Sequence, residues 1–227
     1  MDLDLITNFD FAVIWRYLPA LLTGLWTNCL LTGLGFVAGG IVLGTLLALA
    51  NLSRLRFVSW PAFVFVEFWR STPLLVQAVW MHFAFPLISG IATTPFQSGL
   101  LALLFNVSAY CSEIIRAGIL GVPHGQFEAA RALGISAPIV WLRVIMPQAL
   151  RIIVPPLTGT VISVFKATAI LSILAINDLM RAAARISSYT IKPIEIYTTA
   201  ALLALLTGLI ITWFGSRLER YYRQSGH

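Results

Sequence analysis

Four charged residues form two pairs with the same spacing inside apolar sequence. Glu67 and Arg70 lie in one hydrophobic block, Glu113 and Arg116 lie in another, and in each pair the acid precedes the base by three residues. Residues three apart share one face of a helix, so each pair can form a salt bridge within its own helix. Charges inside a membrane pair or line a watery path, so the two pairs predict either structural pairing near the membrane edge or a polar route for a solute.

A fifth charge, Lys166, stands alone within an apolar block. No acidic residue lies within one helical turn of it, and the block that contains it is predicted to be helical from residue 150. A lysine so deep in a membrane cannot readily extend its ammonium group to the surface. We therefore expect Lys166 to line a transport path near the middle of the membrane.

Pro73 interrupts the second apolar block directly after Arg70 and Thr72. Proline removes a helix hydrogen bond and disfavours helical backbone at the residue before it. Broken helices at membrane depth are tolerated where they line a cavity, and an ordinary kink is the alternative. The break beside Arg70 predicts a polar pathway, with Tyr110 and Glu113 nearby.

Familiar catalytic patterns are missing. Neither lysine, Lys166 or Lys192, follows a glycine, whereas the P-loop requires that order to hold phosphates. The three histidines lie far apart, and no Gly-x-Ser-x-Gly sequence occurs. We expect no catalytic residue, no metal site and no bound cofactor in this chain.

The composition explains which elements must position these residues. Of 227 residues, 59% are hydrophobic and only 11% are charged, whereas soluble domains contain about 25% charged residues. A soluble protein of this length has too little interior for so much apolar sequence, so lipid must cover much of the surface. The net charge of +6 comes from residues in short loops, which indicates a membrane protein and not nucleic-acid binding. Cys29 and Cys111 lie in apolar runs and are expected to be buried thiols.

Apolar blocks predict an all-α integral membrane protein with five transmembrane helices, forming a single domain over residues 1–227. A spanning helix needs about 20 apolar residues, and the predicted spans are 20–49, 57–88, 97–120, 150–176 and 194–216. Four glycines at close spacing in the first span predict tight packing against another helix: Gly35, Gly39, Gly40 and Gly44.

Loop charges predict the orientation. Most arginines flank the blocks on one side, whereas the other side receives Asp2, Asp4 and Asp10 and an uncharged loop at 89–94. The segment 178–195, with three basic residues, is an exception. The positive-inside rule places the N-terminus outside and the C-terminus in the cytoplasm.

The polar segment 121–148 is predicted to form a cytoplasmic helix-turn-helix. One helix covers 126–133 and ends at Gly134 in a left-handed conformation. Ser136 caps a second helix, with Pro138 in its first turn, that ends before Pro147. This elbow can be a docking surface for a partner or an amphipathic hairpin lying on lipid.

The same segment resembles the EAA loop of binding-protein-dependent ABC importers. The spacing matches that of the family: Glu-Ala-Ala is followed by a glycine, and after nine further residues by a sequence like Ile-x-Leu-Pro. The residues are Glu128, Ala129, Ala130, Leu133, Gly134 and Val144 to Pro147. In that family the loop is a coupling helix that docks into the ATPase. The resemblance implies coupling roles for Glu128, Ala129, Ala130, Leu133, Gly134 and Pro147.

Two further stretches are similar to the polar amino-acid branch of that family: Phe68 to Gln77 and Ala109 to Gly118. The stretch Lys166 to Ile170 departs from the Lys-Asp-Thr-Ser-Leu of that branch, which affects the expected substrate more than the architecture. The candidate pathway residues are Arg70, Thr72, Pro73, Gln77, Tyr110, Glu113 and Lys166.

The resemblance implies a permease subunit in a bacterial inner membrane that imports a polar amino acid or a related small polar solute by ATP-driven alternating access. It implies a second permease copy, identical or homologous, two cytoplasmic ATP-binding subunits that use ATP and Mg, and an external solute-binding protein. An ion-gradient-driven transporter is the alternative, but five spans divide poorly into repeated halves. An intramembrane enzyme would need a convergent nucleophile or metal set, and none is visible.

Overall fold

Long helices dominate the computed structural model, which describes residues 12–224 and contains no strand within that range. Four helical runs there are long and apolar enough to cross a membrane: Ala12–Asn51, Pro95–Leu120, Ala137–Leu174 and Pro193–Tyr222. The first run consists of α2 (Ala12–Leu34), the π-helical η1 (Gly35–Leu43) and α3 (Gly44–Asn51). The acidic N-terminal residues of the orientation argument lie outside the described range.

The second predicted span is not one helix. It is divided into α4 (Arg56–Ser71), α5 (Leu74–Phe83) and α6 (Phe85–Ser89). Thr72 takes an extended conformation, with φ −107° and ψ 141°, because the ring of Pro73 disfavours helical backbone at the residue before it. The break that Pro73 was predicted to make in the span 57–88 is therefore confirmed, and a second division, between α5 and α6, was not predicted.

Close packing by the glycines of the first run is confirmed. A Cβ atom added at Gly39 would lie 2.5 Å from the carbonyl oxygen of Leu104, and one at Gly44 would lie 3.0 Å from Cβ of Cys111. Both neighbours belong to α7 (Pro95–Leu120), the third long run. The first run and α7 therefore approach each other more closely than larger side chains would permit.

Segment 121–148 is partly as predicted. Helix α8 (His124–Ala132) is followed by Gly134 with φ 67°, which confirms the left-handed glycine. Ser136 precedes α9 (Ala137–Val140) but makes no side-chain capping hydrogen bond. The helix also does not end before Pro147, because η2 (Trp141–Ile145) leads directly into α10 (Met146–Thr168). A π turn widens the helix ahead of a proline that lacks an N–H, so the helix continues.

The chain beyond α10 forms a short connection and a final long helix. The 3₁₀ helix η3 (Ala169–Leu174) is followed by α11 (Leu179–Thr190) and α12 (Pro193–Gln224). Asp178 caps α11, since its Oδ1 accepts a hydrogen bond of 2.8 Å from the backbone N–H of Arg181. The segment 178–195, predicted only as a loop, thus contains a helix.

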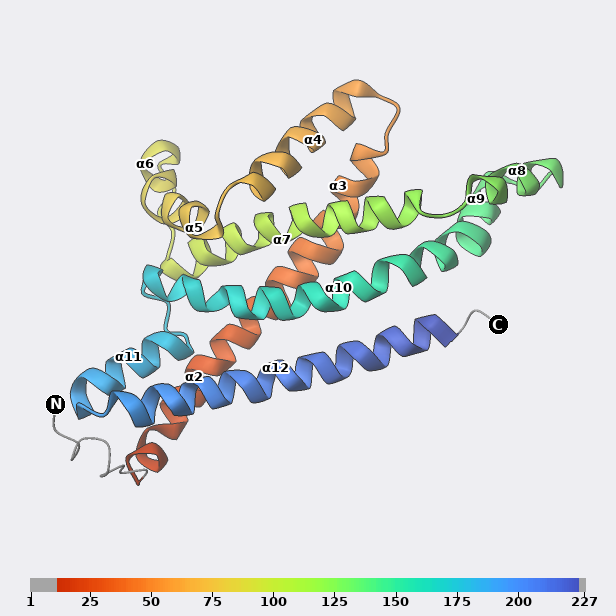
Figure 1. The fold of residues 1–227 in the computed structure, drawn as a ribbon. Coiled ribbons are helices and arrows are strands. Elements are labelled where there is room, and N and C mark those ends of the chain that lie inside the picture. Colours follow the sequence, from red (N-terminus) through yellow and green to blue (C-terminus); the bar gives the residue numbers. More distant parts are fainter. Residues whose placement is uncertain (1–11, 225–227) are drawn as a thin grey trace.

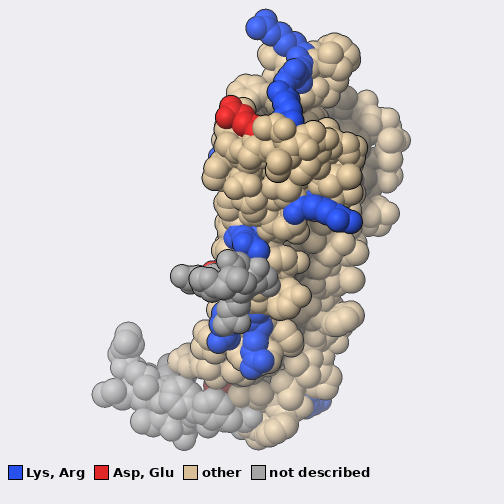
Figure 2. Space-filling model, turned by 90° about the vertical axis from the view of Figure 1, so that its right-hand side faces the viewer, with Lys and Arg blue, Asp and Glu red and all other residues tan. Residues whose placement is uncertain are grey.

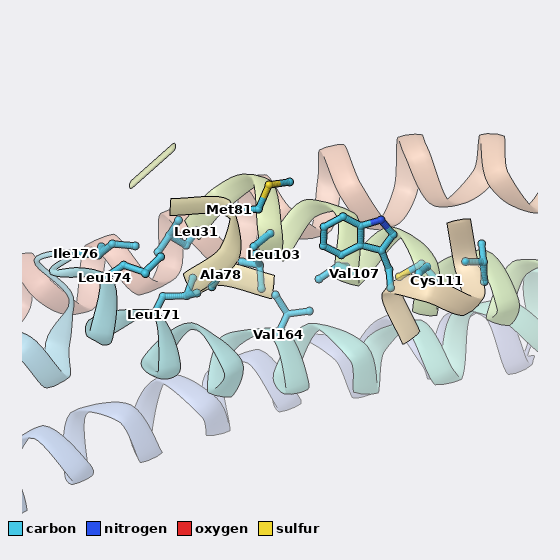
Figure 3. Close-up of a cluster of buried hydrophobic side chains, with 14 residues drawn as sticks. Leu31, Ala78, Met81, Leu103, Val107, Cys111, Val164, Leu171, Leu174 and Ile176 are labelled. Atoms are coloured by element: carbon cyan, nitrogen blue, oxygen red, sulfur yellow. The ribbon is translucent and has the colours of Figure 1, made fainter. Parts of the chain in front are cut away.

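A buried core holds α7 against its neighbours. Leu31 of α2, Ala78 of α5 and Leu103 of α7 pack with Val164 of α10 and Leu171 of η3. Figure 3 shows these side chains converging from helices that are far apart in the sequence. Because α7 contributes to this cluster and to a second one that includes Ile115, it is the central helix of the fold.

The helices run back and forth between two ends of the molecule. Figure 1 shows the start of α2, α6 and α11 at one end, and the α3–α4 connection, α8, α9 and the end of α12 at the other. The second end, shown in Figure 2, carries several lysine or arginine patches and few acidic ones. We call it the basic end.

Candidate functional site: a broken helix beside a row of charges

The break between α4 and α5 leaves three backbone carbonyls without their helical partners, and side chains replace those partners. Thr72 Oγ1 donates to the carbonyl of Phe68 at 2.8 Å, and the hydroxyl of Tyr110 donates to the carbonyl of Arg70 at 3.3 Å. The carbonyl of Trp69 would pair with residue 73 in a continuous helix, but proline has no N–H to donate. It instead accepts a hydrogen bond of 2.9 Å from Nε2 of Gln77.

Gln77 and Asn106 together hold the broken backbone. The Gln77 side chain is 5% exposed, and its Nε2 also lies 3.0 Å from the carbonyl oxygen and 2.6 Å from Oγ1 of Thr72. Asn106 of α7 donates to Oε1 of Gln77 at 3.0 Å and to the carbonyl of Trp69 at 3.2 Å. These contacts satisfy backbone groups that would be costly to leave unpaired in a membrane.

The two charged pairs form one row across α4 and α7. Arg70 lies 3.3 Å from Glu67 and 3.9 Å from Glu113, and Glu113 accepts two hydrogen bonds of 2.9 Å from Arg116. The guanidinium of Arg70 also lies 5.9 Å from the ring centre of Tyr110. Two acids and two bases cancel, so the row contributes no net charge. The Nε atom of Arg70 is buried and has no hydrogen-bond partner among the described residues.

A cavity of about 380 Å³ opens beside this row. Its lining includes Arg70 of α4, Asn106, Tyr110 and Glu113 of α7, and Ser163 of α10. Glu113 also lines a second cavity of about 780 Å³, which includes Glu67 and Arg116 and extends toward Asn51 at the basic end. The charged row therefore lies between two cavities, each of which has polar and charged side chains in a partly apolar lining.

Lys166 is not part of this arrangement. It lies in the last α-helical turn of α10, and the 3₁₀ helix η3 continues the same helical run to Leu174. It lines a different cavity, between α10, α11 and α12, together with Met180 and Tyr197. Within this chain, the structure brings six of the seven candidate pathway residues together and places Lys166 on another face of α10.

The candidate coupling residues lie on or near α8. Glu128, Ala129 and Leu133 are exposed, with Leu133 77% exposed, whereas Ala130 is buried. Glu128 lies in the second turn of α8, after Pro123 at the cap position, so it does not cap the helix. Its Oε1 lies 3.6 Å from Nδ1 of His124.

Three site residues were not predicted from the sequence. Asn106 precedes Tyr110 by four residues and Glu113 by seven, so all three share one face of α7. That spacing in an otherwise apolar helix could have indicated Asn106. The other two, Thr160 and Ser163, line the cavity from α10, and hydroxyl side chains are too common in membrane helices to single them out.

The described part of the chain is thus a bundle of long apolar helices with a polar break and a charged row inside it, the arrangement of a membrane transport subunit. Residues 40–224 match the family described as the inner membrane component of binding-protein-dependent transport systems. The chain belongs to this family, and it is a multi-pass membrane protein and the permease subunit of an ABC importer.

Individual relatives agree with this assignment. The chain is 38% identical over 208 residues to the L-cystine transport system permease TcyB of Bacillus subtilis, covering 89% of this chain and 88% of the relative. It is 32% identical over 214 residues to the glutamine transport system permease GlnP of Escherichia coli, covering 94% and 97%. A crystal structure of an amino acid ABC transporter with histidines superposes with a TM-score of 0.87 at 35% identity, covering 95% of this chain and 100% of that one.

Proposed function

We propose that this permease imports a small zwitterionic solute, an amino acid or a close derivative, along the cavity beside the α4–α5 break. The observation that carries the proposal is the charged row of Glu67, Arg70, Glu113 and Arg116, whose charges cancel next to a cavity that Arg70, Asn106, Tyr110 and Glu113 help to line. A path without net charge favours a solute that is itself neutral overall but polar. The names of relatives that transport cystine and glutamine support this substrate class.

We further propose five membrane crossings, in which α4 and α5 together form the second. The chain reverses direction at each connection between the two ends of the molecule, and α2 starts at the end opposite to the one where α12 finishes. That arrangement requires an odd number of crossings. The basic end would then be cytoplasmic, with the start of α2 outside. Labelling of Leu5→Cys and Tyr222→Cys from one side of sealed vesicles tests this orientation, and labelling of both positions from the same side would contradict it.

Energy would come from partner subunits. We propose that the importer contains two ATP-binding subunits that use ATP and Mg, and that the exposed face of α8 docks on one of them. A second permease completes the path, and an external binding protein delivers the solute. The location of α8 at the basic end supports this arrangement. Pro147 lies in the first turn of α10, where the helix leaves the docking segment.

The sequence-based proposal for Lys166 stays open to experiment. Its side chain is exposed on the face of α10 that turns toward α11 and α12. We propose that Lys166 lines the solute path only in the assembled importer, and that it has no part in the cavity beside Arg70 within one chain.

Copurification with mass spectrometry of partners and bound small molecules, followed by uptake in proteoliposomes, tests the function. We expect ATP-dependent uptake of labelled glutamine or cystine only when the ATPase and binding protein are present. Uptake by this chain alone, driven by an ion gradient, would instead support a secondary transporter. Arg70→Gln and Glu113→Gln should each reduce uptake, since each leaves a neighbouring charge poorly compensated. Uptake equal to that of the wild type in both variants would exclude the charged row from the path.

A further inference from the structure

A further cavity, of about 850 Å³, forms an apolar groove on another face of α10. It is lined by Val154, Leu157, Thr158 and Val161 of α10, by Phe36 and Ile41 of η1, and by residues of α12 between Ile210 and Tyr222. No residue lines both this groove and the cavity beside Arg70. The groove therefore has no part in the proposed solute path.

The floor of the groove is where α12 crosses α10. A Cβ atom added at Gly215 would lie 3.1 Å from Cβ of Thr158, so the two helices nearly touch there. On either side of this contact the side chains of α12 remain uncovered: Ile210 is 56% exposed, Phe214 is 63% exposed and Leu218 is 49% exposed. These apolar side chains form walls that the described part of the chain does not fill.

The groove beyond Arg217 has the length of part of one lipid tail. From Arg217 back to Ile210 is seven helical steps, or about 10 Å along α12. One leaflet contributes roughly half of the hydrocarbon core of a bilayer, about 15 Å. About the first two thirds of an acyl chain that enters from the basic end would therefore lie along the groove.

Cationic side chains lie at the basic end of the groove. Arg217 lines the groove and stacks on Trp213, with its guanidinium carbon 4.5 Å from the ring centre. Arg151 of α10 precedes Val154 by three residues, so it continues the same helix face toward the basic end. No acidic residue lines the groove, and the neighbouring Glu219 and Arg220 lie outside its lining. Guanidinium groups bind phosphate through paired hydrogen bonds.

We propose that this groove binds one anionic phospholipid, with an acyl chain between α10 and α12 and the phosphate on Arg217. Tyr221 and Tyr222, whose rings lie 5.5 Å apart, mark the level of the headgroups, where tyrosines collect at membrane surfaces. A second copy of the chain is the alternative occupant, and the disulfide test described below distinguishes it from a lipid.

Thermal unfolding of the purified importer in detergent tests the site. We expect palmitoyl-oleoyl-phosphatidylglycerol to raise the midpoint and palmitoyl-oleoyl-phosphatidylethanolamine to have little effect. Arg217→Gln should weaken the apparent affinity for phosphatidylglycerol roughly tenfold, as loss of a charge-assisted hydrogen bond predicts. Arg185→Gln, which removes an exposed arginine of α11 far from the groove, is the matched control and should respond like the wild type.

Further variants separate the lipid tail from the headgroup. Val161→Trp places a large ring in the groove and should reduce the response while Arg217 remains, and Arg217→Lys should restore part of it. The proposal is overturned if both lipids act equally or if Arg217→Gln responds like the wild type. It is also overturned if Ile211→Cys, in a Cys29→Ser background, forms disulfides between copies in high yield, because the groove would then be covered by protein.

Discussion

Replacing Gln77 by leucine would remove the side chain that terminates the broken helix while keeping nearly the same volume. The Nε2 group has two hydrogens for three nearby acceptors, the carbonyl of Trp69 and both oxygens of Thr72, and Oε1 accepts from Asn106. The variant therefore loses about three hydrogen bonds at a site that is 5% exposed. We expect it to lower stability and transport together.

The magnitude follows from what remains unpaired. The carbonyl of Trp69 keeps its bond of 3.2 Å from Asn106, and Thr72 Oγ1 keeps its bond to Phe68, so these groups stay satisfied. The carbonyl of Thr72 loses its hydrogen bond from Gln77, and one donor of Asn106 loses its acceptor. At roughly 1–3 kcal/mol for each buried unsatisfied group, the total is about 2–6 kcal/mol. By the scaling for soluble domains of this size, that corresponds to a midpoint lower by roughly 4–24 °C.

Thermal unfolding in detergent and uptake in proteoliposomes measure these effects. Gln148→Leu is the control, because Gln148 is a partly buried glutamine whose side chain donates to the carbonyl of Val144, four residues earlier in the same helical run. A double-mutant cycle of Gln77→Leu with Asn106→Leu should show coupling of about 1 kcal/mol. If Gln77→Leu matches the wild type in both assays, the hydrogen bonds at the break do not stabilise the fold.

Three further predictions concern other parts of the chain. Gly134→Val forces a β-branched residue to φ 67° at a cost of about 1–2 kcal/mol. It should therefore lower retention of the ATPase or uncouple ATP hydrolysis from uptake, while the spans still insert. Full retention and uptake would contradict the coupling role. Lys166→Met should reduce uptake with normal assembly, and unchanged uptake and substrate choice would refute its pathway role. Burial raises the pKa of the Asp178 carboxyl, so its ionised form destabilises the fold and stability falls as pH rises through that raised pKa. The unfolding midpoint of Asp178→Asn should therefore rise relative to that of the wild type as pH rises, measured between about pH 4 and 8. A difference between the two midpoints that stays constant with pH would refute the effect.

The sequence predicted features that depend on local backbone chemistry. Thr72 leaves the helix because Pro73 follows it, and Gly134 takes a left-handed conformation because glycine enters it without strain. The glycines of the first run predicted a close approach without naming the partner. Their contact with Cys111 of α7 depends on packing between distant segments, which spacing along one helix does not reveal.

Features that depend on helix continuity were predicted less well. Pro147 was expected to end a helix, but the π turn of η2 lets the helix pass through it. At the other end of the same run, the change from α-helix to the 3₁₀ helix η3 after Thr168 was not predicted either. Asn106 was not predicted because its role depends on the packing of α4 against α7. It donates a hydrogen bond to the carbonyl of Trp69, which lacks a helical partner only because of the break.

The charged row is arranged so that α4 and α7 can move apart at low electrostatic cost. Glu67 pairs with Arg70 at 3.3 Å within α4, and Glu113 pairs with Arg116 at 2.9 Å within α7. The contact between the helices, from Arg70 to Glu113, is the longest at 3.9 Å. Among the ion pairs of the row, separation of α4 from α7 would therefore break only this one, and every charge would keep its partner in its own helix. A row of single charges paired only across the helices would leave unpaired charges in a membrane, whereas the paired row suits a transport subunit whose path must open and close.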